Sequence, residues 1–123
     1  MKRYDPEKTP PAEEWLALEE EEKQRLIERH HRKARIRLPD VRMHAMFHMV
    51  VENQLAMEEP PVVRALHRLQ SGGLTRHDAI HAIGLVLAEF MYDIYNTNGA
   101  SGGPDESYYP ALEQLTAESW LNS

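Results

Sequence analysis

Two histidine pairs offer the clearest possibility of chemistry in this sequence, and the members of each pair are four residues apart. His44 and His48 lie in the segment HAMFHMVVENQ, and His77 and His81 lie in RHDAIHAIG. In an α-helix, residues at this spacing lie one turn apart on the same face, so both rings of a pair point the same way. Divalent zinc, nickel, copper and iron ions accept imidazole nitrogen, so each pair could supply two ligands to one ion.

We expect the two pairs to meet in the folded chain. The sequence predicts helices over residues 41–57, 61–70 and 76–95, separated by short connections. Successive helices joined in this way are expected to be antiparallel, so the first and the third should run parallel. His44 and His77 both lie near the start of their helices, and parallel helices would place the two pairs at nearly the same height.

Two further residues fit a site between these helices. Glu52 lies one turn after His48, where a carboxylate could bind a metal ion or orient an imidazole. Gly84 follows His81 by about a turn, and the lack of a side chain there would let the partner helix come close. The predicted metal ligands are His44, His48, Glu52, His77 and His81. The ion would be a divalent transition metal such as zinc, nickel or iron.

The same histidines also fit a structural or protein-interaction module that binds no ligand. His48 shares its helical stripe with Phe47, Val51 and Leu55, and histidines on such apolar faces usually form hydrogen bonds within a core or an interface. Neither pair has the Glu of a His-Glu-x-x-His metalloprotease helix, and no serine elbow, phosphate loop or dinucleotide fingerprint is present. A general base at His48 oriented by Glu52 is a further possibility. The sequence therefore leaves open whether the protein is an enzyme.

The other three histidines receive no role. Residues 23–42 contain eight Lys or Arg and only two acidic residues, and a helix predicted over 19–35 places these bases toward its C-terminal end, where they compensate the helix dipole. His30 and His31 lie in this basic run, and we predict that solvent surrounds them. His67 is isolated on the short helix predicted over 61–70.

Composition limits the class of protein. With 123 residues, 41% of them hydrophobic, the chain fits one domain with a modest core. It has no cysteine, which excludes disulfides, thiolate ligands and a cysteine nucleophile. A formal net charge of -6 argues against non-specific nucleic-acid binding. Because the N-terminus lacks an apolar signal region and the apolar stretch over 79–90 is too short to span a membrane, we expect a cytoplasmic protein.

Periodicity and capping residues predict an all-α fold, a small bundle of about five or six helices. Leu38-Pro39-Asp40 is expected to end one helix and cap the next, and Thr75 with Asp78 predicts a further cap. The remaining helices are expected to begin at Pro10, behind a Thr9 cap, and to cover 110–120. The predicted organisation is a helical domain over 1–96 and a flexible linker with a short C-terminal helix over 97–123.

The distribution of charge and aromatic residues predicts a homodimer. From His77 onward the chain has seven acidic residues and no Lys or Arg, whereas residues 23–42 carry a net formal charge of +6, eight bases minus two acids. The C-terminal segment also contains apolar groups that commonly anchor interfaces: Tyr108, Tyr109, Leu112, Leu115 and Trp120. The flexible connection over 96–104 leaves open whether this segment folds back on its own chain or reaches a second subunit. We expect a homodimer that is held partly by this segment against the basic helix.

The two histidine motifs also carry a resemblance to a known family. His44-x-x-x-His48-x-x-Val51-Glu52-Asn53-Gln54-Leu55-Ala56 and the run Arg76-His77-Asp78-Ala79-Ile80-His81-Ala82-Ile83-Gly84 resemble an uncharacterised bacterial domain-of-unknown-function family of short helical proteins. Trp15-Leu16-Ala17-Leu18 and Leu38-Pro39 add to the likeness, which covers about residues 12–95. The resemblance implies a helical fold and makes both histidine pairs and Glu52 part of the defining pattern, but it brings no established activity.

Overall fold

The computed structural model describes residues 1–33 and 41–122, and every regular element in these ranges is a helix. The helices are α1 (Ala12–Ala17), α2 (Glu20–Lys33), α3 (Val41–Ala56), α4 (Pro60–Ser71), α5 (Arg76–Thr97), the short π-helix η1 (Pro104–Tyr108), α6 (Tyr109–Gln114) and α7 (Ala117–Leu121). The predicted all-α class is confirmed. No helix in these ranges is long and apolar enough to cross a membrane. The predicted break at Leu38-Pro39-Asp40 lies outside the described residues.

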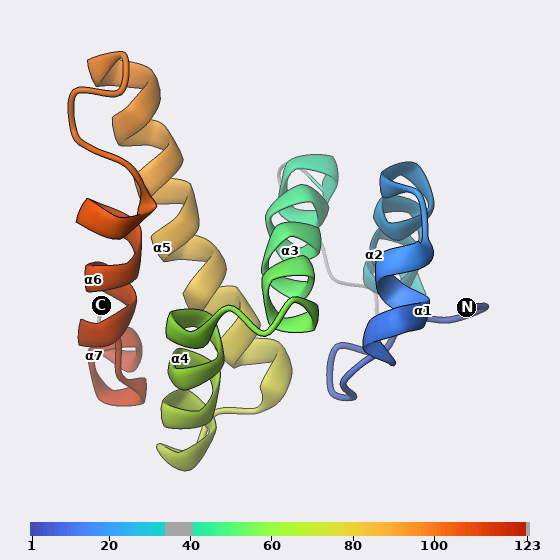
Figure 1. Cartoon of the computed structure of the whole chain (residues 1–123). Coiled ribbons are helices and arrows are strands. Elements are labelled where there is room, and N and C mark those ends of the chain that lie inside the picture. The colour runs from blue at the N-terminus through green and yellow to red at the C-terminus, as the bar shows by residue number, and fades with distance from the viewer. Residues whose placement is uncertain (34–40, 123) are drawn as a thin grey trace.

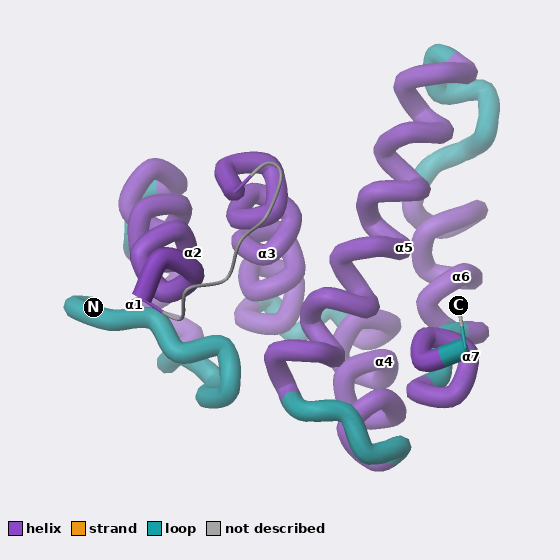
Figure 2. The backbone as a smooth tube through the Cα atoms, turned by 180° about the vertical axis from the view of Figure 1, so that it is seen from behind, coloured by secondary structure: helices purple, strands orange, loops and turns teal. Residues whose placement is uncertain are grey.

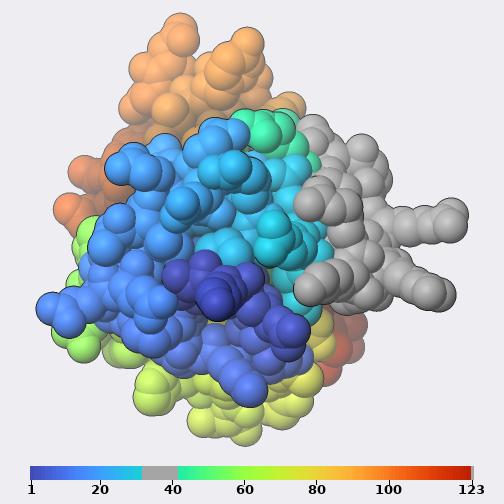
Figure 3. Space-filling model, turned by 90° about the vertical axis from the view of Figure 1, so that its right-hand side faces the viewer, coloured from blue at the N-terminus to red at the C-terminus, as the bar shows by residue number. Residues whose placement is uncertain are grey.

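Helix α3 stands at the centre of the molecule. Helices α1 and α2 pack against one side of it and α5 against the other, while α4, η1 and α6 pack together against α5 (Figure 1). The two ends of the chain lie on opposite sides, the N-terminus beside α1 and α2 and the C-terminus beside α7 (Figure 2). The first residues of the chain cross the outer face formed by α1 and α2 (Figure 3). The arrangement leaves α3 with a neighbour on each side.

Two clusters of buried apolar residues lie on either side of α3. The larger one joins α3, α4, α5 and the C-terminal segment, and it contains Val51, Val62, Ala65, Leu66, Leu69, Ala79, Ile80, Ala82, Ile83, Leu87, Tyr108 and Leu112. The smaller one joins the N-terminal segment, α1, α2 and α3, and it contains Tyr4, Trp15, Leu26, Ile27, Ala45 and Met49. Because α3 contributes to both, residues around most of its circumference are removed from water.

The prediction that the helices of the two histidine pairs run parallel is wrong. Contacts between α3 and α5 pair Glu52 with Arg76, His48 with His77 and His44 with His81, which is an antiparallel register. The cause lies in the connection 57–59, where Glu58 has a φ of 56°. After this turn α4 continues in the direction of α3 instead of folding back beside it, and α5 then runs back past both (Figure 1).

The start of α5 follows the sequence prediction, and the start of α1 does not. The Thr75 hydroxyl accepts a hydrogen bond from the Asp78 backbone N–H at 3.1 Å, as expected of an N-cap. The preceding Gly73 has a φ of 104°, a conformation that a residue with a side chain rarely adopts. Helix α1 begins only at Ala12, behind Pro11, so Thr9 does not cap it.

The C-terminal segment folds onto its own chain. Instead of one helix over 110–120, the structure has α6 and α7, separated where the Thr116 hydroxyl accepts a hydrogen bond from the Ser119 N–H and begins a new helix. Tyr108 and Leu112 are buried in the larger cluster against α4 and α5. The Arg68 guanidinium donates to the carbonyl oxygen of Leu112 near the end of α6 at 3.2 Å. The predicted homodimer is not tested by these contacts and stays a prediction.

Candidate metal centre

Six of the seven histidines gather where α2, α3 and α5 meet. Each helix contributes two rings: His30 and His31 come from α2, His44 and His48 from α3, and His77 and His81 from α5. The ring centroids of His77 and His81 are 4.2 Å apart, those of His44 and His81 4.5 Å, and those of His31 and His44 4.7 Å. The seventh histidine, His67, is exposed on α4. The two predicted pairs therefore do come together, with a third pair that the sequence analysis left out.

Four of these rings form the tightest set. His31, His44, His48 and His81 each offer one nitrogen, and these four nitrogen atoms all lie within 4.8 Å of one another. A tetrahedral ion with metal–nitrogen distances of about 2.1 Å holds its ligands about 3.4 Å apart, so the rings would close by at most about 1.4 Å around it. The geometry is compatible with a metal centre and also with a hydrogen-bonded core.

The prediction that solvent surrounds His31 is wrong, and His30 is partly buried. His31 is completely buried, and its Nδ1 lies 2.8 Å from the Ile27 carbonyl oxygen. Since a carbonyl oxygen can only accept, Nδ1 of the neutral ring carries the hydrogen and Nε2 keeps a lone pair. That Nε2 is buried without a partner among the described residues. One feature of the sequence indicated that His31 is buried: the apolar Ile27 lies one turn earlier on the same helical face. The basic residues around His31 favoured the opposite interpretation, an exposed face.

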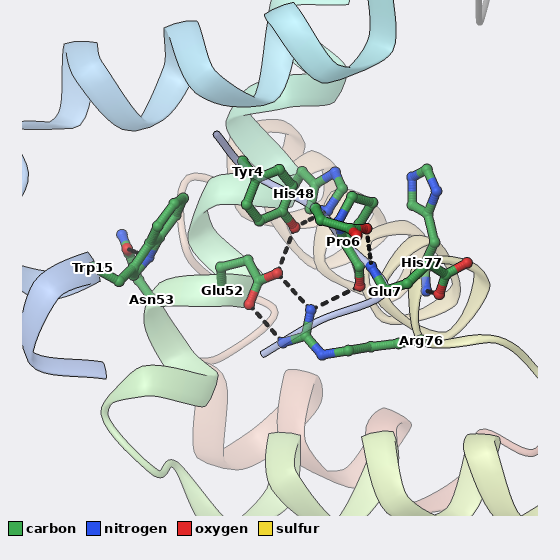
Figure 4. A network of polar contacts seen from close by, with 10 residues as sticks. Tyr4, Pro6, Glu7, Trp15, His48, Glu52, Asn53, Arg76 and His77 are labelled. Carbon is green, nitrogen blue, oxygen red and sulfur yellow. Dashed lines mark hydrogen bonds and ion pairs between the residues drawn. The ribbon is translucent and has the colours of Figure 1, made fainter. Parts of the chain in front are cut away.

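A chain of buried polar groups sets the orientation of His48 (Figure 4). The Tyr4 hydroxyl donates to a carboxylate oxygen of Glu52, and it also lies 2.6 Å from His48 Nε2. A phenol has one hydrogen, so a hydroxyl that donates to Glu52 must accept from His48 Nε2–H. The His48 Nδ1 then keeps its lone pair, and this atom is buried without a partner in the described chain. Sequence reasoning missed Tyr4, because nothing local connects it to α3.

Glu52 is held by a second charged group. Arg76 Nη1 and Nη2 donate to its two carboxylate oxygens, each at 2.8 Å. The Glu52 side chain is only 1% exposed and the Arg76 side chain 5%. Arg76 Nη1 also donates to the Pro6 carbonyl oxygen at 2.9 Å, which ties the N-terminal segment to α5. Of the two roles predicted for Glu52, ligand or orienting group, these contacts favour the second, acting on His48 through Tyr4.

His77 lies at the edge of the four-nitrogen set. Its ring stacks on that of His48 at 5.4 Å, and its Nε2 is buried with no hydrogen-bond partner in residues 1–33 and 41–122. Its backbone N–H donates to Glu7 at 2.9 Å, a second contact between the N-terminal segment and the start of α5. The structure thus places His77 beside the cluster, while its ring nitrogens do not join the mutually close group.

The environment keeps the central imidazoles neutral. Burial lowers the pKa of His44 to about 4 and the pKa of His81 to about 3, and neighbouring imidazoles that would repel a positive charge add to both effects. Burial is the main reason why the pKa of His48 lies well below its usual value, and repulsion by the neighbouring imidazoles adds to the effect. The neutral ring is the form that binds metal ions, so these three histidines need not lose a proton to serve as ligands at neutral pH.

No protein-family model, curated protein or solved structure matches this chain. The resemblance to a bacterial family with paired histidine motifs stays a prediction, and the site must be interpreted from its own geometry.

Proposed function

We propose that this protein binds one divalent transition metal ion through His31, His44, His48 and His81. The observation that carries the proposal is the state of the buried nitrogens. His31 Nε2 and His48 Nδ1 lack hydrogen-bond partners among the described residues, and their other ring nitrogens are engaged by the Ile27 carbonyl and by Tyr4. Metal-binding histidines are commonly held in this way, with one nitrogen fixed by an acceptor and the other facing the ion.

The competing function is a structural core in which the histidines satisfy one another. The contact between His44 Nε2 and His81 Nε2, at 2.9 Å, fits such a core, because one ring can donate to the other. A hydrogen-bonded core, however, leaves few buried polar atoms unpaired, and here three imidazole nitrogens have no partner in the described ranges: His31 Nε2, His48 Nδ1 and His77 Nε2. An ion would accept two of these lone pairs directly, and for this reason we favour the metal function.

Zinc is the first ion to test. The proposed ligands are four neutral imidazoles with no thiolate, a set that suits zinc, nickel, copper and iron. Zinc has no electronic preference for a particular geometry and is usually tetrahedral when four protein side chains bind it. It can therefore accept the arrangement that α2, α3 and α5 impose.

Elemental analysis of untagged protein, purified without chelator, tests the proposal directly. We expect about one equivalent of metal per chain, and competition with a chromophoric chelator should then give the zinc affinity. His31→Gln and His48→Gln should each weaken that affinity at least tenfold, because each removes one ligand. His67→Gln is the matched control, because His67 is exposed on α4. This substitution should leave the zinc affinity unchanged. A metal-free protein with no measurable affinity for zinc, nickel, copper or iron would overturn the proposal.

A further inference from the structure

A pocket of about 380 Å³ opens beside the histidine cluster. Three of the four proposed ligands, His44, His48 and His81, lie in its wall. The other lining residues are mostly apolar: Met43, Phe47, Ile80, Gly84, Leu85, Ala88 and Trp120. Met43 and Leu85 are each more than half exposed, at 53% and 58%, so the pocket is open to solvent. Its size falls in the range that accommodates small organic ligands.

Gly84 keeps part of this pocket empty. A Cβ atom added at position 84 would meet only the Phe47 Cβ within 4 Å, at 4.0 Å. The packing of α3 against α5 therefore does not require a glycine there, contrary to the close approach that the sequence analysis expected. The missing side chain instead leaves open space in the pocket wall, half-way along a helix in which glycine is otherwise unfavourable.

The charge of the proposed centre indicates what kind of head group would enter. Four neutral imidazoles leave the charge of a divalent ion uncompensated, and the buried carboxylate of Glu52 is already paired with Arg76. A single negative charge brought from the pocket side would be attracted to this uncompensated charge. Zinc is usually four-coordinate but sometimes expands to five, so the ion can take one further ligand from the pocket side.

We propose that the pocket binds a small carboxylate with an apolar body, whose carboxylate group coordinates the metal ion. The apolar body lies against Phe47, Ile80 and Leu85, and the carboxylate faces the side on which His44 and His81 approach each other. This inference rests on the proposed function and adds the class of ligand to it. The apolar wall selects against acetate, and the ion selects against a neutral molecule of the same length.

Calorimetric titration with octanoate, acetate and 1-octanol, on zinc-loaded and on metal-free protein, tests the ligand class. We expect octanoate to bind the zinc-loaded protein at least tenfold more tightly than acetate, because burial of several methylene groups adds to the affinity. Octanol should bind more weakly than octanoate, and metal-free protein should lose most of the octanoate affinity. In cobalt-substituted protein, octanoate should also change the visible absorption of the ion, which reports coordination independently of heat.

Variants of α5 test the location. Gly84→Leu should fill the pocket and abolish octanoate binding while zinc affinity stays within a few-fold of wild type. Ala88→Leu narrows the same pocket about one turn further along and serves as the second variant if Gly84→Leu does not fold. Tyr92→Leu is the matched control, because it places a leucine on α5 at a position that is 70% exposed and outside the pocket.

The outcomes separate this inference from the proposed function. Zinc binding with no preference for octanoate over acetate would overturn the ligand proposal and leave the metal proposal standing. Equal octanoate affinity with and without zinc would overturn coordination by the carboxylate. Octanoate affinity that survives both pocket variants would overturn the location. A protein that binds no metal would remove both proposals together.

Discussion

The Tyr4 hydroxyl lies 2.6 Å from His48 Nε2, although 44 residues separate the two in the sequence. This contact brings the N-terminal segment into the histidine cluster. With Glu52 as the acceptor of the phenol hydrogen, it also determines which nitrogen of His48 keeps its lone pair. The N-terminal segment is thus part of the candidate site, even though it carries none of the proposed ligands.

Tyr4→Phe should weaken zinc binding by about tenfold to a hundredfold, because removal of a group that orients a ligand typically has an effect of this size. Each proposed ligand remains present, so about one equivalent of zinc should still bind at saturation. Chelator competition on the two proteins measures the difference. Tyr95→Phe is the control, since Tyr95 is 83% exposed at the far end of α5. Equal affinities for wild type and Tyr4→Phe would show that the hydroxyl does not orient a ligand.

Metal-free protein should lose stability as the pH falls below about 6.5, the usual histidine pKa in an unfolded chain. The folded-state pKa values of His44 and His81 are about 4 and about 3, so the unfolded state binds protons first. A depressed histidine pKa contributes stability that is complete above the unfolded value and is lost as pH drops through the folded one. Urea unfolding at pH 7.5 and pH 5.0 measures the loss.

The double variant His44→Gln/His81→Gln separates these two residues from other titrating groups. It should show a smaller difference in unfolding free energy between pH 7.5 and pH 5.0 than wild type shows. A difference as large as that of wild type would assign the pH dependence to other residues.

Arg76→Met should cost about 3–5 kcal/mol of unfolding free energy, because it leaves the buried Glu52 carboxylate without its charged partner. The double variant Glu52→Gln/Arg76→Met should recover much of this loss, since no buried charge then remains. Arg64→Met provides the comparison: its ion pair with Glu113 is exposed and should contribute less than about 1 kcal/mol. Urea unfolding of the four proteins would contradict this account if Arg64→Met and Arg76→Met were equally destabilising.

Gly84→Ala should raise the unfolding free energy by about 0.5–1 kcal/mol, because alanine is the better residue within a helix and the added methyl group meets nothing closer than the Phe47 Cβ at 4.0 Å. Gly73→Ala should act in the opposite direction, since Gly73 has a φ of 104° that alanine adopts only with strain. Thermal and urea unfolding of both variants would disprove this reasoning if the two substitutions shifted stability in the same direction.

The sequence by itself determined what depends on neighbours within a turn or two. The spacing of His44 and His48, and of His77 and His81, placed each pair on one helical face. Thr75 indicated the start of α5, because its hydroxyl accepts a hydrogen bond from a residue only three positions on. Helix periodicity and capping are local, so composition and spacing were sufficient to predict an all-α fold and two of its histidine pairs.

Only the tertiary structure decided which faces meet. The direction of α4 depends on the turn at Glu58. The antiparallel register of α3 and α5 depends on that direction, and it pairs His44 with His81 rather than with His77. His31 joins the cluster because α2 packs on α3, and Tyr4 reaches His48 because the N-terminal segment crosses toward α5. These contacts join residues far apart in the chain, and their energies depend on how all the helices pack at once, which no local pattern encodes.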